Sequence, residues 1–269
     1  MNSVNKTLYI PLYGKDYVSR KGIILNDPKA EEIWKRRKFP LKGKSRSKYL
    51  AYYMAMRAAV YDRWAEENIQ RDPEAVVIHI GCGLDSRVLR LSEMENHWYD
   101  IDFPAVIKER SRYFRETDTY HMIGIDVREN GWLDQIPGGN AIVVMEGVSM
   151  YLFTQDLRKL LQRLSAKFDS VQLLMDVYSD FAARASRVKN PINDVGVTQV
   201  YGLDDPTVLD DTGLHFLKEH DMCPPELTAQ LKSSEKWIFE NLYNGAFAKK
   251  LYHLYEYGSA ERSVTTEEV

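Results

Sequence analysis

Acidic residues follow three short apolar stretches of the sequence: Asp102, Asp126 and Glu146. A run of β-branched and other apolar residues that ends in this way is typical of a buried parallel strand. The carboxyl ends of adjacent parallel strands face one crevice, and ligands of open α/β sheets bind there. We therefore expect the three carboxylates to line one binding site. A helix cap or turn is the alternative for each acid taken singly, but caps at successive strand ends explain the pattern less well.

Two glycines, Gly81 and Gly83, follow the first of the apolar runs. Paired glycines after a strand let the backbone turn sharply and approach a ligand, with N–H groups of the next helix pointing at it. The third glycine of the dinucleotide fingerprint is replaced by Ser86, so this motif alone fits a plain strand-to-helix turn equally well. Asp102 lies 21 residues after Gly81, where a carboxylate accepts hydrogen bonds from both hydroxyls of a ribose. Asp100 is the next candidate for that contact.

Arg57 falls inside the apolar stripe of an amphipathic segment at 47–68. Burial of a guanidinium is costly unless an anion pairs with it. A ligand carboxylate bound through two parallel hydrogen bonds is one candidate for that anion. An internal ion pair with Asp62, Glu146 or another acid is the other, and snorkelling of the long side chain would need no partner. The spacing does not separate these interpretations.

The elements that must position these residues alternate between strand and helix. Strands are expected at 75–80, 97–101, 120–125, 141–145 and 171–177, and helices at 47–68, 86–93, 104–116 and from Thr154 onward. Asp85 and Thr154 are the expected N-caps of two of these helices. The alternation predicts an α/β fold with a doubly wound, mostly parallel sheet. We expect one domain over 1–269, with an N-terminal cover at 1–44, a cofactor-binding core at 45–177, and a substrate cover that also completes the sheet at 178–269.

The composition of the 269-residue chain is that of an ordinary globular protein, with 44% hydrophobic and 28% charged residues. Its 36 basic and 39 acidic residues leave a net charge of −3, which argues against a dedicated nucleic-acid binder. Its two cysteines suit a reducing compartment. The first residues lack the apolar core of a signal peptide, and no apolar stretch is long enough to span a membrane. We therefore expect a cytoplasmic protein that binds neither nucleic acid nor membrane.

Four motifs together resemble the leucine carboxyl methyltransferase family, in particular its bacterial, polyketide O-methyltransferase-like branch. The motifs are Gly-Cys-Gly-Leu-Asp-Ser-Arg at 81–87, Trp-Tyr-Asp-Ile-Asp-Phe-Pro at 98–104, Gly-Ile-Asp-Val-Arg at 124–128 and Glu-Gly-Val-Ser-Met-Tyr at 146–151. The resemblance covers roughly residues 7–177. It implies the Rossmann-like fold of class I S-adenosylmethionine-dependent methyltransferases, and O-methyl transfer, most often to a carboxylate.

The resemblance also implies a role for each site residue. Arg57 would hold the methionine carboxylate of S-adenosylmethionine, and the glycine turn (Gly81, Gly83) the methionine backbone. Asp102 would bind the ribose hydroxyls, Asp126 and Val127 the adenine, and Glu146 the methionine ammonium. The ribose diol, the adenine amine and the methionine ammonium of S-adenosylmethionine all donate hydrogen bonds, so a site rich in carboxylates suits this cofactor. The phosphates of NAD are anionic acceptors and would instead need hydrogen-bond donors.

The methyl acceptor is expected to be a small-molecule carboxylate or phenol. A sulfonium is already activated and a carboxylate is already ionised at pH 7, so catalysis would need positioning and exclusion of water rather than a catalytic side chain. Tyr151 is a candidate wall of the acceptor site or a core residue. Aromatic residues of the segment 178–225 would suit an apolar acceptor: Tyr178, Phe181, Tyr201 and Phe216.

Several alternatives stay open from the sequence. These are a cofactor-binding regulator without turnover, an NAD-dependent oxidoreductase, and a protein carboxyl methyltransferase. The basic run at 35–48 would steer an anionic acceptor or simply be solvated. His215, His220, Asp221 and Cys223 fit no standard zinc spacing, so no metal is expected, and the oligomeric state is not predicted.

Overall fold

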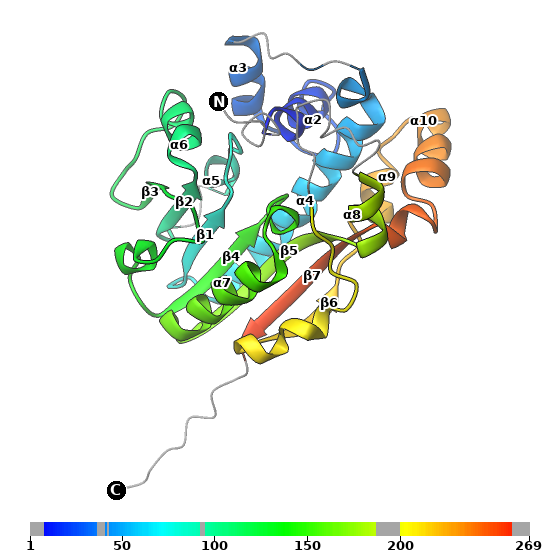
Figure 1. The fold of residues 1–269 in the computed structure, drawn as a ribbon. Coiled ribbons are helices and arrows are strands. Elements are labelled where there is room, and N and C mark those ends of the chain that lie inside the picture. Colours follow the sequence, from blue (N-terminus) through cyan, green and yellow to red (C-terminus); the bar gives the residue numbers. More distant parts are fainter. Residues whose placement is uncertain (1–7, 37–40, 42, 92–94, 187–199, 260–269) are drawn as a thin grey trace, which may run out of the picture.

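The structure is a computed structural model that describes residues 8–36, 41, 43–91, 95–186 and 200–259. Its centre is a sheet with strand order β3-β2-β1-β4-β5-β7-β6 (Figure 1). The strands are β1 Val76–Ile80, β2 Trp98–Asp102, β3 Tyr120–Gly124, β4 Asn140–Met145, β5 Ser170–Tyr178, β6 Leu214–Glu219 and β7 Tyr252–Ser259. The first five are mutually parallel, and β7 lies antiparallel between β5 and β6. The predicted mostly parallel α/β sheet is confirmed.

The strand order reverses at β1, which pairs with β2 on one side and with β4 on the other. In open α/β sheets the connections leave this point in opposite directions, which opens a crevice at the carboxyl ends of the two strands. Gly81 follows β1 and Glu146 follows β4, so two predicted site residues flank this point. The topology therefore supports the predicted location of the site.

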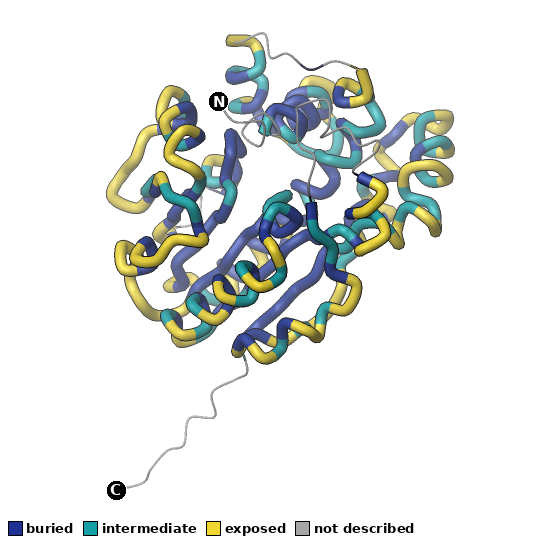
Figure 2. The backbone as a smooth tube through the Cα atoms, in the orientation of Figure 1, coloured by how far each residue is buried: buried dark blue, intermediate teal, exposed yellow. Residues whose placement is uncertain are grey.

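Helices cover both faces of the sheet. They are α2 Tyr9–Ser19, α3 Pro28–Arg36, α4 Lys48–Arg71, α5 Arg87–Arg90, α6 Pro104–Arg110, α7 Thr154–Lys167, α8 Asp180–Ser186, α9 Pro225–Thr228 and α10 Ser233–Ile238. Figure 2 shows the centre of the sheet buried and the outer turns of α7 and α10 largely exposed. None of the helices in the described ranges is long and apolar enough to cross a membrane.

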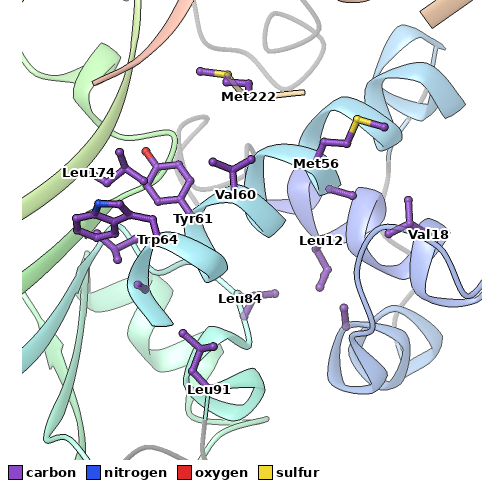
Figure 3. Packing of buried hydrophobic residues seen from close by; sticks show 14 of the residues in the cluster. Leu12, Val18, Met56, Val60, Tyr61, Trp64, Leu84, Leu91, Leu174 and Met222 are labelled. Carbon is purple, nitrogen blue, oxygen red and sulfur yellow. The ribbon is translucent and has the colours of Figure 1, made fainter. Parts of the chain in front are cut away.

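Two apolar cores result because side chains alternate along each buried strand. Leu174 of β5 faces the core formed with α4, whereas Leu173 faces the core formed with α7. Figure 3 shows Tyr61 and Trp64 of α4 beside Leu174. The long helix α4 is thereby held against the sheet, and this contact fixes the position of Arg57 on the same helix.

Some predicted boundaries are wrong. The helix expected at 104–116 ends at Arg110, where the chain turns so that Phe114 lies under the Arg110 guanidinium, 3.9 Å away. The helix expected at 86–93 begins at Arg87 and its described part ends at Arg90, with 92–93 outside the described residues. Ser86, not Asp85, occupies its N-cap position. Thr154 is the first residue of α7 rather than its cap, a position that Phe153 takes.

The segment 178–269, expected to cover the substrate and to complete the sheet, contains the strands β6 and β7. β6 lies at the edge of the sheet next to β7. Phe216 lies on β6 and contacts Tyr255 and Tyr257, so it belongs to the sheet and the interpretation as an acceptor contact is wrong. The reason is that Phe216 sits in a six-residue strand that pairs with the last strand, a long-range contact that no local pattern reveals.

Candidate functional site

A cavity of about 660 Å³ opens at the carboxyl ends of the parallel strands. Its lining includes all the predicted cofactor-binding residues and Tyr151, namely Arg57, Gly81, Gly83, Asp102, Asp126, Val127, Glu146 and Tyr151. Of the aromatic residues expected to suit an apolar acceptor, Tyr178 lines the cavity, whereas Phe181, Tyr201 and Phe216 do not. These residues come from α4 and from the ends of β1, β2, β3 and β4, so segments far apart in sequence share one wall. The expectation that the acids gather at one edge of the sheet is confirmed.

The glycine turn after β1 is shaped for close approach. Gly81 has a φ of +71° and Gly83 a φ of +52°, a region that residues with a side chain rarely adopt. A Cβ added at Gly81 would lie only 2.1 Å from Val148 Cγ2, so no other residue fits this position without movement of the neighbouring loop. The turn therefore leaves its backbone bare toward the cavity.

Gly81→Ala is expected to destabilise the protein by clearly more than Gly22→Ala. Both substitutions place alanine at a positive φ, which costs on the order of 1–2 kcal/mol. Only the Cβ at Gly81 meets another atom, because nothing lies within 4 Å of the Cβ position at Gly22. Thermal unfolding of both variants measures the difference, and equal losses would show that the contact with Val148 relaxes without cost.

Asp102 is the last residue of β2 and lines the cavity. One oxygen accepts the Gly83 N–H at 2.9 Å and the other accepts the Phe103 N–H at 2.7 Å. Each carboxylate oxygen has a second lone pair, so two further donors, such as the hydroxyls of a ribose, are accommodated. Burial raises the pKa of the Asp102 carboxyl to about 6.

Asp100, the alternative ribose ligand, has a structural role instead. It is fully buried and accepts hydrogen bonds from Arg110 and from the Tyr120 hydroxyl, the latter at 2.7 Å. Arg110 belongs to α6 and Tyr120 to β3, and both elements pack against β2. The spacing of acids along the sequence does not predict that these side chains reach Asp100. Among the two acids of this strand, only Asp102 lines the cavity.

Asp126 follows β3 and is paired with Arg128 two residues later. Arg128 Nε lies 2.9 Å from Oδ1 and 3.1 Å from Oδ2, and this hydrogen-bonded pairing lowers the pKa of the Asp126 carboxyl. Arg128 and Val127 also line the cavity. An amine donor approaching Asp126 would therefore share the carboxylate with Arg128.

Arg57 forms ion pairs inside the protein, which is one of the interpretations that the sequence left open. Its Nη2 lies 3.0 Å from Glu146 Oε1, and its Nε donates to the same oxygen at 3.1 Å. Its Nη1 donates to Asp176 at 2.8 Å and to the Tyr252 hydroxyl at 2.7 Å. A guanidinium has five N–H groups, so one on Nη2 remains for a ligand in this arrangement. For Arg57 to bind a ligand carboxylate through two parallel hydrogen bonds, Glu146 would therefore have to give up its contacts with Nε and Nη2.

Glu146 is the centre of a buried ionic network. Its second oxygen accepts from Arg87 Nη2 at 2.5 Å, and Arg87 also donates to Asp62 at 2.6 Å. Burial opposes ionisation of Glu146, but Arg57, Lys15 and Arg87 outweigh it and lower the pKa of the carboxyl to about 2. Glu146 is thus an anion at neutral pH, which suits a cationic ligand group at this end of the cavity.

Asp176 and Tyr252 were not predicted as site residues. The Asp176 carboxylate is fully buried and accepts from Arg57, the Tyr252 and Tyr61 hydroxyls and the Gly147 N–H. A carboxylate near the end of the apolar run 171–177 was the available signal for Asp176. Tyr252 gave no signal, because it reaches the site only through the antiparallel pairing of β5 with β7.

The other half of the cavity is aromatic. Its tyrosines come from five separate elements of the chain and are Tyr53, Tyr151, Tyr178, Tyr243 and Tyr252. Tyr178 and Tyr252 have ring centroids 4.9 Å apart, and Tyr252 lies 6.3 Å from Tyr53. The cavity thus has an ionic end beside the glycine turn and an aromatic end where the C-terminal segment closes over α4.

The histidine and cysteine residues near 215–223 lie apart from the cavity. His220 Nε2 is 2.5 Å from Glu256, and Asp221 accepts the Cys223 N–H at 2.9 Å. Within the described ranges, no group of three or more histidine, cysteine or acidic side chains could hold a metal ion.

A sheet of this topology, with a bare glycine turn after β1 and acids after β2, β3 and β4, defines the Rossmann-like class of S-adenosylmethionine-dependent methyltransferases. The residues present suit that cofactor, because the half-buried Asp102 and the buried Glu146 carboxylates line the cavity and the cofactor carries donors and a positive charge. Residues 11–165 match the family model of leucine carboxyl methyltransferases. The chain belongs to this family, and its cofactor is S-adenosylmethionine rather than NAD.

Two curated proteins are similar in sequence. The chain is 30% identical to the tetracenomycin polyketide synthesis O-methyltransferase TcmP of Streptomyces glaucescens, over 88% of this chain and 90% of that protein. It is 28% identical to the S-adenosyl-L-methionine-dependent methyltransferase dpfgK of Gibberella zeae, over 62% of this chain and 61% of that protein. The match to the first relative extends well beyond the part that the family model covers.

Solved structures share the fold at low sequence identity. A duf574 family protein from Streptomyces avermitilis has a TM-score of 0.59 at 10% identity, covering 93% of this chain and 96% of that one. Magnesium protoporphyrin IX methyltransferase from Synechocystis, with bound S-adenosylhomocysteine, has a TM-score of 0.50 at 12% identity, covering 95% and 100%. These likenesses confirm the class I methyltransferase fold.

Proposed function

We propose that this methyltransferase acts on oxygen, and that its acceptor is the carboxylate of a small molecule. The observation that carries this proposal is the engagement of every Asp and Glu side chain described in the cavity lining. The acids are each bonded, Asp85 to Lys15, Asp102 to backbone N–H groups, Asp126 to Arg128, and Glu146 to Arg57 and Arg87. The lining therefore offers no unengaged acid as a base.

His79, the histidine of the lining, is equally unsuited to act as a base. Its Nε2 lies 3.2 Å from Arg87 Nη1, and a guanidinium only donates, so Nε2 is the acceptor and Nδ1 carries the proton. Burial also lowers the pKa of the His79 imidazole. A phenol or alcohol acceptor needs a general base, whereas a carboxylate is ionised at pH 7 without one.

We assign the cofactor contacts to Arg57, Gly81, Gly83, Asp102, Asp126, Val127 and Glu146. When bound, S-adenosylmethionine supplies a methyl group that its sulfonium already activates. Asp102 would accept the ribose hydroxyls, Glu146 the methionine ammonium, and the Asp126–Val127 segment would meet the adenine. Arg57 would hold the methionine carboxylate. These residues orient the cofactor, and Tyr151 is the proposed wall against which the acceptor lies. Orientation and exclusion of water supply on the order of 7–11 kcal/mol in well-positioned reactions.

Methyl transfer to a panel of small carboxylic acids and phenols tests the proposal, with production of S-adenosylhomocysteine as the readout. Methyl ester formation with acids, and no ether formation with phenols, is the expected result. Ether formation alone would make the carboxylate assignment wrong. Cofactor binding without transfer to any member of the panel would favour a regulatory protein that kept the cofactor site.

Acceptor binding is expected to depend on the charge of the cofactor. The cations of the described lining are each paired with an acid, Lys15 with Asp85, Arg57 with Glu146 and Arg128 with Asp126. An acceptor carboxylate thus finds its main positive partner in the cofactor. We expect a methylatable acid to bind about tenfold or more tightly beside cationic sinefungin than beside neutral S-adenosylhomocysteine, by titration calorimetry. Equal affinities would contradict an anionic acceptor.

A further inference from the structure

Two phenylalanines are exposed next to the aromatic end of the cavity. Phe181 of α8 is 58% exposed and Phe247 is 67% exposed, although both side chains are apolar. Their rings meet edge to face with centroids 6.2 Å apart. Sixty-six residues separate them in sequence, so the tertiary fold brings the pair together. Figure 1 shows α8 and the segment after α10 on the same side of the molecule.

Both phenylalanines lie within a few residues of side chains that line the cavity. Tyr178, three residues before Phe181, lines the cavity, and so does Ala248, the residue after Phe247. Tyr243 is both a lining residue and 36% exposed, so the apolar surface runs from the cavity to the outside. Its ring is stacked on Tyr49 of α4 at 5.0 Å, which anchors this part of the rim to the helix that carries Arg57.

The cavity has limited space for an acceptor beside its cofactor. Pockets of roughly 300–1,000 Å³ enclose one drug-sized ligand, and S-adenosylmethionine is itself of that size. A cavity of about 660 Å³ that holds the cofactor therefore encloses only the reacting end of a larger acceptor. The remainder of such an acceptor would leave at the aromatic end, where Phe181 and Phe247 lie.

We propose that Phe181 and Phe247 form an outer subsite for the apolar, ring-bearing body of the acceptor, whose carboxylate lies within the cavity. The inference rests on the proposed function and adds to it a preference among acceptor acids according to their length. Aromatic side chains bury large apolar areas and prefer edge-to-face or offset contact with other rings. The subsite therefore favours acids that are too long to be enclosed over acids that fit inside.

The test compares Phe181→Ser, Phe247→Ser and the double variant with the unaltered protein on benzoic, biphenyl-4-carboxylic and terphenyl-4-carboxylic acids. We expect the ratio of KM for the terphenyl acid to KM for benzoic acid to rise roughly tenfold per variant, with kcat for benzoic acid unchanged. Leu217→Ser is the matched control, because Leu217 is 51% exposed on β6 and does not line the cavity. It should leave the ratio unchanged.

Binding of S-adenosylhomocysteine and the melting temperature show that each variant is folded, and Phe181→Leu keeps the test open if a serine variant unfolds. An unchanged ratio in folded variants that still methylate benzoic acid would overturn the outer subsite alone. A rise in the ratio with Leu217→Ser as well would also overturn it, because the effect would then follow exposed apolar residues in general. Failure of the unaltered protein to bind or methylate any of the acids would overturn the proposed function, and the subsite with it.

Discussion

Asp102→Asn is expected to weaken binding of S-adenosylhomocysteine by about 100-fold or more without loss of stability. Two hydrogen bonds from the ribose to a charged acceptor are each worth roughly 1.5–3 kcal/mol, and an amide keeps only one acceptor oxygen. The same amide removes a cost to the fold, because burial raises the pKa of the Asp102 carboxyl to about 6. The amide also gives up one of the two oxygens that accept the Gly83 and Phe103 N–H groups. Because these two effects oppose one another, the melting temperature without cofactor at pH 7 should change little.

The sign of the pH dependence follows from the direction of this shift. The pKa is raised from 3.8 in the folded protein, so the neutral form of Asp102 is the one that the fold favours. Its contribution to stability is present below about pH 4 and is lost as the pH rises through about 6. Cofactor affinity should change in the opposite direction and fall as the pH is lowered from 7 to 5, because the ribose needs the charged form. A flat affinity profile over this range would contradict the assignment of the ribose contact.

Asp100→Asn is the matched control, two residues earlier on the same strand. Asp100 is fully buried against Arg110 and does not line the cavity. We expect this variant to lose stability while its folded fraction binds the cofactor normally. The pair of variants thus separates ribose binding from support of the fold. The reverse outcome would assign the ribose to Asp100.

Asp176→Asn is expected to lower the stability of the protein by about 3–5 kcal/mol, the usual cost of breaking a buried ion pair from one side. The carboxylate is fully buried and accepts from Arg57 at 2.8 Å, from Gly147 N–H at 2.6 Å and from Tyr61 at 3.2 Å. An amide would leave these donors in competition for one oxygen and turn its own NH₂ group toward a guanidinium. A fall in melting temperature on the order of 10 °C should result.

The loss should extend to the cofactor site, since Asp176 and Tyr252 together hold Nη1 of Arg57. Asp211→Asn is the control, because Asp211 is 65% exposed in its ion pair with Arg158 and such pairs contribute about 0–1 kcal/mol. Calorimetric melting of both variants, with and without S-adenosylhomocysteine, measures the two effects. If Asp176→Asn melted like Asp211→Asn, the buried network would not depend on this carboxylate.

Local patterns were sufficient for the parallel half of the fold. Each strand from β1 to β5 is a short, largely apolar run, and a glycine or an acid stands at the carboxyl end of each of β1 to β4. The type of each element, its order along the chain and the edge of the sheet that carries the site therefore follow from hydrophobic period and composition. The residues that line the cavity by standing at these ends, such as Gly81 and Asp102, were predictable for the same reason. Parallel strands place their carboxyl ends together whatever the exact packing.

What the sequence by itself determined is therefore the class of fold, the edge of the sheet at which the predicted site residues gather and the chemical types of those residues. The tertiary structure alone decided the partners: that Asp100 belongs to Arg110, that Arg57 lies between Glu146 and Asp176, and that Tyr252 closes the site. The physical reason is how far apart in the sequence the interacting residues lie. Strand ends are set by neighbours along the chain, whereas an ion pair or a ring contact depends on which distant segments pack together. The aromatic end of the cavity is built from such distant segments, so the proposed acceptor rests on packing rather than on any motif.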